Sequence, residues 1–482
     1  MINVLVNHIR CKMIIKKKKK RLIKVNTKDG KVLYLVEPGY FFNEDVFLIY
    51  SQIEDEIEYE DLKSWMMSHY FGGSEIIELK LNSTLKLLKD KNLIEYQDKN
   101  YSKSNIMVKK EVDLVDEYDF YPITQIDIII TKTCNYNCKH CFINFENDVE
   151  VSFDCDKWID ICDKLIGRGL QSVVITGGEP LTIDYLSKLI IFLTRKGVRI
   201  MLLSNGYLID KKFIEEILPY KSLITIQISL DGSSEESHDY QRNKKGSFQK
   251  TINNIKLLTD KGFKVVLAMV VSEVNYNDII DGSMFNLAKD LDVLMLGITT
   301  SIIMTGNAKT SNLQRISQEK TIEIVKFVHN YDFDDTFPKV VISGPPSLTP
   351  EKSVNNLDID RPRCRRGINS FAIRPDGNVV TCSDFAEINY NEYNYGNVFK
   401  DELDDIIGKA SKIQKKIMER YKKIKGICSI CKELRHCGGA CRADSYAKYG
   451  DILSPYPLCQ IMYEKGLFPK EMIDYKRSYK LF

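Results

Sequence analysis

The stretch that decides the fold of this chain is Thr133-Cys134-Asn135-Tyr136-Asn137-Cys138-Lys139-His140-Cys141-Phe142. The apolar run at 126–130 directly precedes it and predicts a short, mostly buried strand. Three cysteines spaced CxxxCxxC in a loop that leaves a strand can converge on one metal cluster. Three thiolates leave one iron of a 4Fe–4S cubane open, and that iron can chelate a small molecule through an amine and a carboxylate. A zinc site would want a fourth ligand, and His140 lies too close to the cysteines to supply it comfortably.

A second motif, Gly177-Gly178-Glu179-Pro180, ends the next predicted strand at 172–177. An amphipathic stretch at 158–170 separates this strand from the cysteine loop, as in a βα unit. Both motifs match, fully and in order, those of the radical S-adenosylmethionine (SAM) enzymes, so the chain resembles that family. The resemblance implies that the three cysteines of the first motif hold a 4Fe–4S cluster that binds SAM.

Length and composition bound the class of protein. At 482 residues the chain should hold two or three domains. With Lys+Arg 69 and Asp+Glu 66 the net charge is +3, so we expect no nucleic-acid or membrane partner. No window reaches the ~18 uninterrupted apolar residues of a membrane span, and the N-terminus lacks the pattern of a signal peptide. The 13 cysteines therefore predict metal ligands or buried thiols, rather than disulfides, in a cytoplasmic protein.

Residues 1–108 predict a small module of strands and helices. Asp29-Gly30 indicates a hairpin turn between two short apolar runs. Helices are expected at 43–53, 60–70 and 74–90, and a strand at 93–96. This winged-helix-like plan resembles the module related to the pyrroloquinoline quinone peptide chaperone PqqD, with which peptide maturases recognise the leader of a precursor peptide.

That resemblance implies β-augmentation, in which the leader peptide adds a strand to the exposed edge of the hairpin. The alternative is a DNA-binding winged helix. The third predicted helix and its end carry four lysines but also Glu75, Glu78 and Asp90, which makes a poor face for tracking phosphates. We therefore expect a precursor peptide, and no nucleic acid, as the partner of this module.

Residues 109–335 predict an α/β domain. Apolar runs alternate with amphipathic stretches, which is the signature of βα repeats and a parallel sheet. Strands are expected at about 126–131, 172–177, 198–203, 223–229, 264–270 and 293–299. The resemblance implies a partial (β/α)6 TIM-like barrel, with its chemistry at the C-terminal ends of the strands.

The resemblance also suggests which residues contact SAM. Gly177-Gly178-Glu179 would meet the methionyl amine. Ser204-Asn205 and Ser229 follow the third and fourth strands and would lie near the ribose. Arg242 is the candidate for the SAM carboxylate, because a guanidinium can bind a carboxylate through two parallel hydrogen bonds. The alternative for Arg242 is an ordinary surface ion pair.

A cysteine-rich segment, 364–482, follows an expected bridging loop at 336–363. Its seven cysteines and Gly377 match the SPASM extension of radical SAM peptide maturases. The resemblance implies two auxiliary 4Fe–4S clusters, although cysteine spacing alone also fits zinc. One cluster would be held by Cys428, Cys431, Cys437 and Cys459, and the other by Cys364, Cys382 and Cys441. Because no eighth cysteine accompanies this field, we expect the second cluster to have an open iron or a non-cysteine ligand from the protein.

Together these features predict a maturase that cross-links a ribosomally made precursor peptide. The resemblance implies three 4Fe–4S clusters, SAM, an external one-electron donor such as flavodoxin or ferredoxin, and a 5′-deoxyadenosyl radical that takes hydrogen from a substrate C–H bond. A substrate cysteine on the open auxiliary iron would give a thioether, which we favour. Two closed auxiliary clusters would instead favour a carbon–carbon or carbon–oxygen link.

Two other functions compete with this prediction. The sulfatase-maturing branch makes formylglycine, and there an aspartate directly follows the cysteine of GxxxxC. Here Ser383 follows Cys382, and Asp384, a candidate base near the substrate, comes one place later. The second competitor is a winged-helix regulator that senses redox state through its clusters. Such a sensor has no need of a SAM cradle, so SAM cleavage would discriminate between the two classes.

Overall fold

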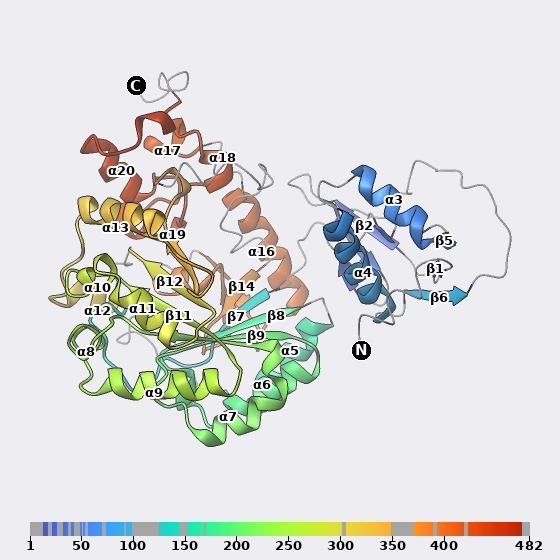
Figure 1. Ribbon diagram of the computed structural model, residues 1–482, viewed down its shortest axis with the longest axis horizontal. Coiled ribbons are helices and arrows are strands. Elements are labelled where there is room, and N and C mark those ends of the chain that lie inside the picture. The colour runs from blue at the N-terminus through green and yellow to red at the C-terminus, as the bar shows by residue number, and fades with distance from the viewer. Residues whose placement is uncertain are drawn as a thin grey trace. The chain divides into compact units, whose positions relative to one another are not determined.

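A computed structural model of the chain describes residues 13–17, 22–26, 32–36, 40–42, 49–50, 52–53, 56–69, 74–90, 93–98, 125–143, 153–167, 170–300, 305–348, 370–388, 393–418 and 423–474. The chain divides into two compact units, residues 1–120 and 121–482 (Figure 1). Three predicted features lie outside the described residues: Cys364, the turn at Asp29-Gly30 and most of the helix expected at 43–53.

The first unit contains two small antiparallel sheets. One has the order β2-β3-β4, with β2 at Leu22–Asn26, β3 at Val32–Val36 and β4 at Tyr40–Phe42. The other has the order β5-β1-β6, with β1 at Met13–Lys17, β5 at Glu56–Glu58 and β6 at Ile94–Asp98. The pairing of β2 with β3 confirms the predicted hairpin, and β6 confirms the predicted last strand.

Two helices of the first unit confirm the second and third predicted ones: α3 Tyr59–His69 and α4 Ser74–Asp90. Helix α4 buries the face that its sequence predicted, since Ile77, Leu81, Leu85 and Leu88 are at most 3% exposed. They share one core with Leu62 of α3. The hairpin strands β2 and β3 belong to a different sheet from β1, β5 and β6. The sequence analysis did not predict β1 and β5, which share a sheet with the predicted last strand, β6.

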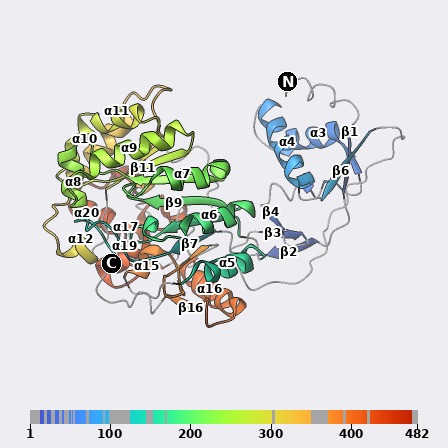
Figure 2. The same ribbon diagram turned by 90° about the horizontal axis from the view of Figure 1, so that it is seen from below.

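The second unit is built on one ten-stranded sheet with the order β13-β12-β11-β10-β9-β8-β7-β14-β15-β16. Strands β7 to β13 run parallel, each beside its neighbour in the chain. Six confirm the predicted strands: β7 Gln125–Ile129, β8 Ser172–Thr176, β9 Arg199–Ser204, β10 Ile224–Ser229, β11 Lys264–Val270 and β12 Met295–Thr299. Helices flank the curved sheet (Figure 2), so the predicted α/β fold with a partial barrel is confirmed.

Helices between the barrel strands bury one face against the sheet. In α5, Asp154 caps the N-terminus by accepting from the Lys157 N–H, and Trp158 is fully buried. Cys155 and Cys162, predicted to be buried thiols, are buried on this helix. The helices up to α13 are α5 Cys155–Ile166, α6 Leu186–Arg195, α7 Lys211–Ile217, α8 Glu235–Arg242, α9 Ser247–Asp260, α10 Tyr276–Ile280, α11 Ser283–Asp290, α12 Gly306–Thr310 and α13 Gln318–Asn330.

Four strands of the sheet were not predicted. Strand β13, Lys339–Ser343, lies inside the expected bridging loop 336–363, so that expectation is wrong for these residues. Strand β14, Ser370–Ile373, pairs parallel with β7, and β15, Asn378–Val380, and β16, Asn394–Asn397, continue antiparallel. The cysteine-rich segment therefore extends the barrel sheet at β7.

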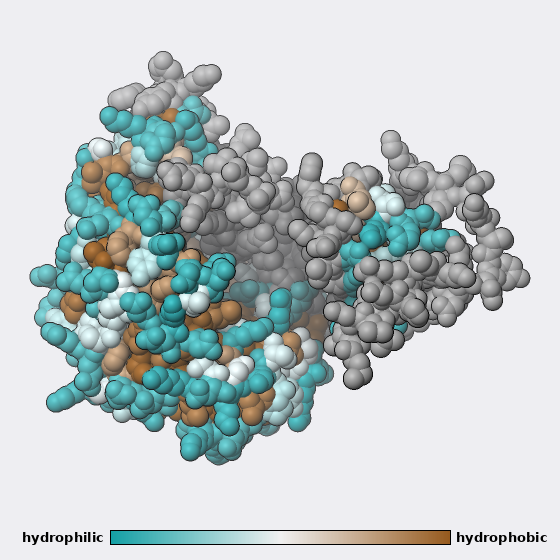
Figure 3. All heavy atoms as spheres, viewed as in Figure 1, coloured by the Kyte–Doolittle hydropathy of each residue, from teal (hydrophilic) through white to brown (hydrophobic). Residues whose placement is uncertain are grey.

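The remaining helices of the second unit lie in its cysteine-rich segment. They are α15 Ser383–Ala386, α16 Leu403–Met418, α17 Ile427–Ile430, α18 Leu434–Cys437, α19 Arg442–Tyr449 and α20 Pro457–Glu464. No helix among the described residues is long and apolar enough to cross a membrane. On the face in Figure 3, hydrophilic residues separate small hydrophobic patches across the described surface of this unit.

Candidate active site

The CxxxCxxC loop begins directly after β7 and carries three thiols inward. Cys138 is buried, and Cys134 and Cys141 are half-buried. The Tyr136 backbone N–H donates to Cys134 Sγ over 3.4 Å, and Arg242 Nη1 donates to Cys138 Sγ over 3.8 Å. Donors aimed at sulfur are the outer-shell contacts that orient and tune the ligands of a metal site.

Burial keeps these thiols protonated in the absence of a metal. It raises the pKa of Cys134 to about 11 and that of Cys141 to about 12, and it raises the pKa of Cys138 as well. Binding of a metal displaces such protons. Three soft sulfur donors within electrostatic reach of one another fit an iron–sulfur cluster in which this loop leaves one iron without a ligand.

The Gly-Gly-Glu-Pro turn after β8 touches the start of the cysteine loop. The Gly178 N–H donates to Thr131 O over 2.8 Å, and the Glu179 N–H donates to Thr133 O over 2.9 Å. A Cβ atom on Gly178 would lie 2.3 Å from Thr133 O. Glycine is therefore required here for the two backbones to approach this closely.

Glu179 joins this turn to the end of β9. Its fully buried carboxylate accepts from Ser204 Oγ over 2.8 Å and from the Asn205 N–H over 2.7 Å. Burial raises the pKa of Glu179, and these hydrogen bonds oppose that shift. Asn205 Nδ2 donates to Asn135 Oδ1 over 2.7 Å, so β9 also contacts the cysteine loop. Ser229, the last residue of β10, is half-buried.

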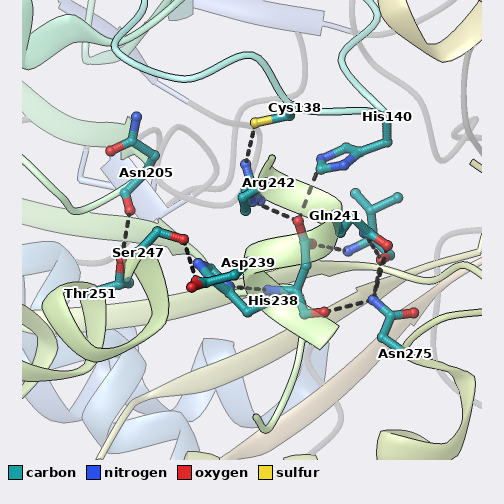
Figure 4. A network of polar contacts seen from close by, with 12 residues as sticks. Cys138, His140, Asn205, His238, Asp239, Gln241, Arg242, Ser247, Thr251 and Asn275 are labelled. Carbon is teal, nitrogen blue, oxygen red and sulfur yellow. Dashed lines mark hydrogen bonds and ion pairs between the residues drawn. The ribbon is translucent and has the colours of Figure 1, made fainter. Parts of the chain in front are cut away.

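Arg242 lies in a buried ionic cluster beside the loop (Figure 4). Its Nε is 2.6 Å from Asp231 Oδ2, and His140 Nε2 is 3.5 Å from the same oxygen. Arg242 is 7% exposed and Asp231 is fully buried, so the alternative of a surface ion pair is wrong. Burial alone would raise the pKa of Asp231, but Arg242 and His140 hold it below its usual value.

The segment at 305–312 holds the cysteine loop from its other side. Asn307 Nδ2 donates to Cys138 O over 3.1 Å, and the Ala308 N–H donates to Cys141 O over 2.9 Å. Thr305 Oγ1 donates to Phe142 O over 2.6 Å, and Ser311 Oγ donates to Lys139 O over 2.7 Å. Sequence reasoning missed this segment, because short polar side chains after a strand carry no periodic signal.

A cavity of about 690 Å³ opens between this segment and the cysteine loop. Its wall includes Cys134, Tyr136 and Asn137 on one side and Asn307 and Thr310 on the other. Such a volume lies within the range of small-molecule sites in proteins. The cavity therefore has room for a small molecule beside Cys134, the first cysteine of the loop.

Four cysteines near the C-terminus line a second, small cavity. The Tyr456 N–H donates to Cys428 Sγ over 3.4 Å, and Ser347 Oγ lies 3.7 Å from Cys459 Sγ. Burial raises the pKa of Cys437 to about 11 and that of Cys431 to about 12. The structure thus brings together one whole predicted ligand set, and four buried thiols around one cavity fit a fully ligated cluster.

Cys382 and Cys441, from the other predicted set, also lie together. Each precedes a short helix, α15 and α19 respectively, and both belong to one buried cluster that includes Phe385. Asp384 Oδ2 lies 3.9 Å from Cys441 Sγ. The remaining predicted cysteine of this set, Cys364, lies outside the described residues, so the structure describes two of its three thiols.

Helix α15 is fastened to the strand that leads into the CxxxCxxC loop. Ser383 Oγ donates to Asp127 Oδ2 on β7 over 3.0 Å. Lys132, two residues before Cys134, places Nζ 3.4 Å from Glu387 Oε2 in a largely buried ion pair. Cys382, the residue before α15, therefore lies near β7, the first strand of the barrel.

Comparison with known proteins finds two matching domains in the second unit. Residues 128–281 match the radical SAM superfamily, and residues 364–433 match SPASM, an iron–sulfur cluster-binding domain. The chain is 27% identical to the antilisterial bacteriocin subtilosin biosynthesis protein AlbA of Bacillus subtilis over 58% of each chain, so it spans little more than half of that relative. It is 24% identical to an AdoMet-dependent heme synthase of Methanosarcina barkeri, over 68% of this chain and 94% of that one.

A solved structure shares the fold. Streptococcus suis SuiB bound to S-adenosylmethionine aligns over 92% of this chain and 100% of SuiB, with a TM-score of 0.61 and 16% identity. SuiB bound to precursor peptide SuiA aligns with the same TM-score. The chain therefore contains a radical SAM domain, which binds a 4Fe–4S cluster and SAM, followed by a SPASM domain, which binds auxiliary iron–sulfur clusters.

Proposed function

We propose that this protein is a radical SAM maturase that installs a cross-link, most simply a cysteine thioether, in a ribosomally synthesised precursor peptide. Two contacts between the α15 region and the β7 region carry the proposal. Ser383 donates a hydrogen bond to Asp127 of β7, and Glu387 forms an ion pair with Lys132. They bring Cys382 of an auxiliary site toward the loop that holds the SAM cluster. A substrate between the two sites could present a C–H bond to one and a thiol to the other.

When bound, a reduced cluster and SAM would supply the radical chemistry that removes a hydrogen from the substrate. The residues of the chain position the reactants and exclude water. In the proposal Cys134, Cys138 and Cys141 hold the cluster, and the Gly177-Gly178 backbone faces the methionyl amine. Ser204 and Asn205 donate hydrogen bonds to the buried carboxylate of Glu179. Glu179 would therefore support the Gly-Gly-Glu-Pro turn through these two bonds.

Arg242 would bind the SAM carboxylate with the edge that faces the loop. Its Nε is engaged by Asp231, while Nη1 lies beside Cys138 Sγ. Asp231 thus compensates the buried charge of the guanidinium. Ser204, Asn205 and Ser229, at the C-terminal ends of β9 and β10, remain the proposed ribose neighbours.

The proposed partner is a precursor peptide bound through its leader. SuiB is described in complex with precursor peptide SuiA, which supports a peptide substrate for a chain of the same fold. The PqqD-like role of the first unit stays a proposal: the leader would add a strand to an edge of the β2-β3-β4 sheet. An external one-electron donor such as flavodoxin or ferredoxin would reduce the SAM cluster.

The test uses anaerobically reconstituted protein, SAM, dithionite and a panel of cysteine-containing candidate peptides. We expect two products, 5′-deoxyadenosine and a cross-linked peptide. The peptide should be lighter by two hydrogen atoms, and iodoacetamide should alkylate one thiol fewer than in the starting peptide. The C138A variant should form neither product. C162A removes a buried thiol on α5 that belongs to none of the cysteine sets, and it should retain both.

Other products would redirect the proposal. Loss of two hydrogens with every thiol still alkylatable would indicate a carbon–carbon or carbon–oxygen link. Formylglycine would indicate the sulfatase-maturing reaction, with Asp384 as its candidate base. Because an AdoMet-dependent heme synthase is also similar to this chain, turnover of an iron porphyrin with no reaction of any peptide would overturn the proposal.

A further inference from the structure

We infer that an acidic one-electron carrier protein docks on a basic surface beside the CxxxCxxC loop, and that the reducing electron enters the protein there. We name this surface the lysine patch, and it consists of Lys139, Lys244 and Lys245 together with the exposed Tyr240. The inference deepens the proposed function. It rests on that function for the need of an external donor, and it names the surface on which the donor binds.

Lys139 connects the patch to the cysteines. It lies inside the CxxxCxxC loop, directly after Cys138 and two residues before Cys141. Its backbone N–H donates to Gln241 O over 3.0 Å, so the loop touches the C-terminal end of α8. Its Nζ donates to Asn312 Oδ1 over 3.3 Å in a solvent-exposed hydrogen bond. Because electron tunnelling slows steeply with distance, the surface beside these cysteines is a favourable place for an electron to enter.

Two aromatic rings lie next to the lysine side chains. Lys139 Nζ is 4.0 Å from the centroid of the Tyr240 ring, and Lys244 Nζ is 5.7 Å from that of Tyr207. Both distances lie within the ~6 Å over which a cation is attracted to a ring. Tyr240 still keeps 41% of its surface exposed. Tyr207 meets Tyr136 of the cysteine loop edge-on, with ring centroids 5.7 Å apart, so the patch contacts the loop at two points.

The positive charge of the patch lacks a compensating acid in the part of the chain that the structure describes. None of its three lysines pairs with a described carboxylate. Asp239, which precedes Tyr240, is used inside the fold: its Oδ1 accepts from Ser247 Oγ over 2.7 Å and from the Phe248 N–H over 2.8 Å. Glu235 and Glu236 lie in the first turn of α8, at the opposite end of that helix. Three cations beside an exposed aromatic side chain suit an acidic protein partner.

A carrier that binds briefly fits a patch of this kind. Electron-transfer encounters bury little surface and are weak, and complementary charge speeds their association. In each encounter the carrier would be oxidised by one electron and the SAM cluster reduced by one, with no bond formed and no proton transferred. An acidic protein of the flavodoxin or ferredoxin type delivers electrons in this way.

A second lysine beside a cysteine provides the matched control. Lys432 directly follows Cys431 of the C-terminal cavity, just as Lys139 directly follows Cys138, and its side chain is exposed. Its Nζ donates to Glu471 O over 2.7 Å. Electron entry at the C-terminal cysteines would depend on Lys432, whereas entry at the lysine patch would not.

The experiment uses the full chain, reconstituted anaerobically, without any peptide. The reductant is either a reduced flavodoxin of acidic isoelectric point or reduced methyl viologen, a small cation that needs no docking surface. Freeze-quenched electron paramagnetic resonance (EPR) follows the appearance of the signal that SAM perturbs in a separate sample. We compare the natural protein with K244E/K245E, K139Q and K432E.

We expect K244E/K245E to slow reduction by flavodoxin on the order of tenfold at low salt, because it reverses the charge that attracts the carrier. K139Q should slow it by a smaller factor, and K432E should leave it unchanged. Reduction by methyl viologen should not be slowed in any variant. Added salt should slow the natural protein with flavodoxin and remove the difference, because salt screens exposed charges.

The other outcomes contradict the inference. Equal slowing with flavodoxin and methyl viologen would mean that the lysines support the cluster rather than a partner. Slowing in K432E but not in K244E/K245E would place electron entry at the C-terminal cysteines. Unchanged flavodoxin rates throughout would mean that the lysines only cover the tyrosine rings. If the double variant does not fold, K245E decides, since its side chain makes no described contact. Because no peptide is added, failure of the cross-linking reaction would leave these rates untouched.

Discussion

At the scale of single residues, the buried pair of Arg242 and Asp231 is the strongest electrostatic feature of the site. Removing one partner of a buried pair leaves an uncompensated charge, which typically costs about 3–5 kcal/mol. We expect D231N to lower the free energy of unfolding of the second unit by about 3 kcal/mol. Urea denaturation, followed by Trp158 fluorescence in a W65F background, would measure it.

The control for this prediction is an exposed ion pair in the same unit. Lys465 Nζ lies 3.2 Å from Glu319 Oε1, and both side chains are about half exposed. Solvent screens such a pair, so E319Q should leave the urea midpoint nearly unchanged. Equal losses in D231N and E319Q would mean that the Arg242–Asp231 pair contributes no more than a surface contact.

His238 predicts a pH dependence of stability. Burial lowers its pKa to about 4, and its Nδ1 accepts from the Asp231 N–H over 3.1 Å. Because the folded state holds His238 neutral, its contribution is complete above pH ~6.5 and is lost as the pH falls toward about 4. Between pH 8 and 5 the loss should approach about 2 kcal/mol.

The H238N variant tests this pH dependence. Its amide oxygen can still accept a hydrogen bond but does not titrate. We expect the urea midpoint of the variant to fall less than that of the natural protein between pH 8 and 5. Parallel pH curves would show that other groups, such as buried His140, account for the whole loss.

At the scale of elements, two loops meet at Gly178 with no room for a side chain. A Cβ atom there would clash with Thr133 O at 2.3 Å, so G178A must move the backbone that carries the first cysteine. We expect G178A to lose the SAM-induced change of the EPR signal while it retains the auxiliary clusters. The matched control is G408A on α16, where a Cβ atom meets nothing within 4 Å.

The segment at 305–312 predicts a milder effect. Asn307 donates to Cys138 O and to Asn137 Oδ1, and N307A removes both hydrogen bonds. At about 1 kcal/mol for each of the two bonds, SAM binding should weaken roughly thirtyfold. Equilibrium binding of SAM to the reconstituted protein measures this. N253A, on the exposed face of α9, should bind SAM normally.

The same elements explain what could be predicted. Strands β7 to β12 are apolar runs of a buried parallel sheet, and α4 has a regular apolar face, so both were visible in the sequence. Strand β13 alternates between exposed and half-buried residues among prolines, and it was missed. The contacts of Asn307 depend on a loop that lies far away in the sequence, which no local pattern encodes.

At the scale of the whole molecule, the resemblance to the SPASM extension implied how the C-terminal thiols group, but not the distance between the groups. That distance depends on the pairing of β14 with β7, which joins the SPASM segment to the barrel in one sheet. The ties from α15 to Asp127 and Lys132 follow from this pairing. Long-range strand pairing is invisible to local sequence patterns, so the proximity of the two sites emerged only from the structure.

The iron and sulfide content of the anaerobically reconstituted chain, together with EPR spectra before and after SAM, would show how many clusters the protein holds. Three 4Fe–4S clusters predict about twelve irons per chain, and SAM should perturb one signal only. About four irons together with bound zinc would contradict the account, because the C-terminal cysteines would then be structural and no auxiliary iron would stand beside the SAM site.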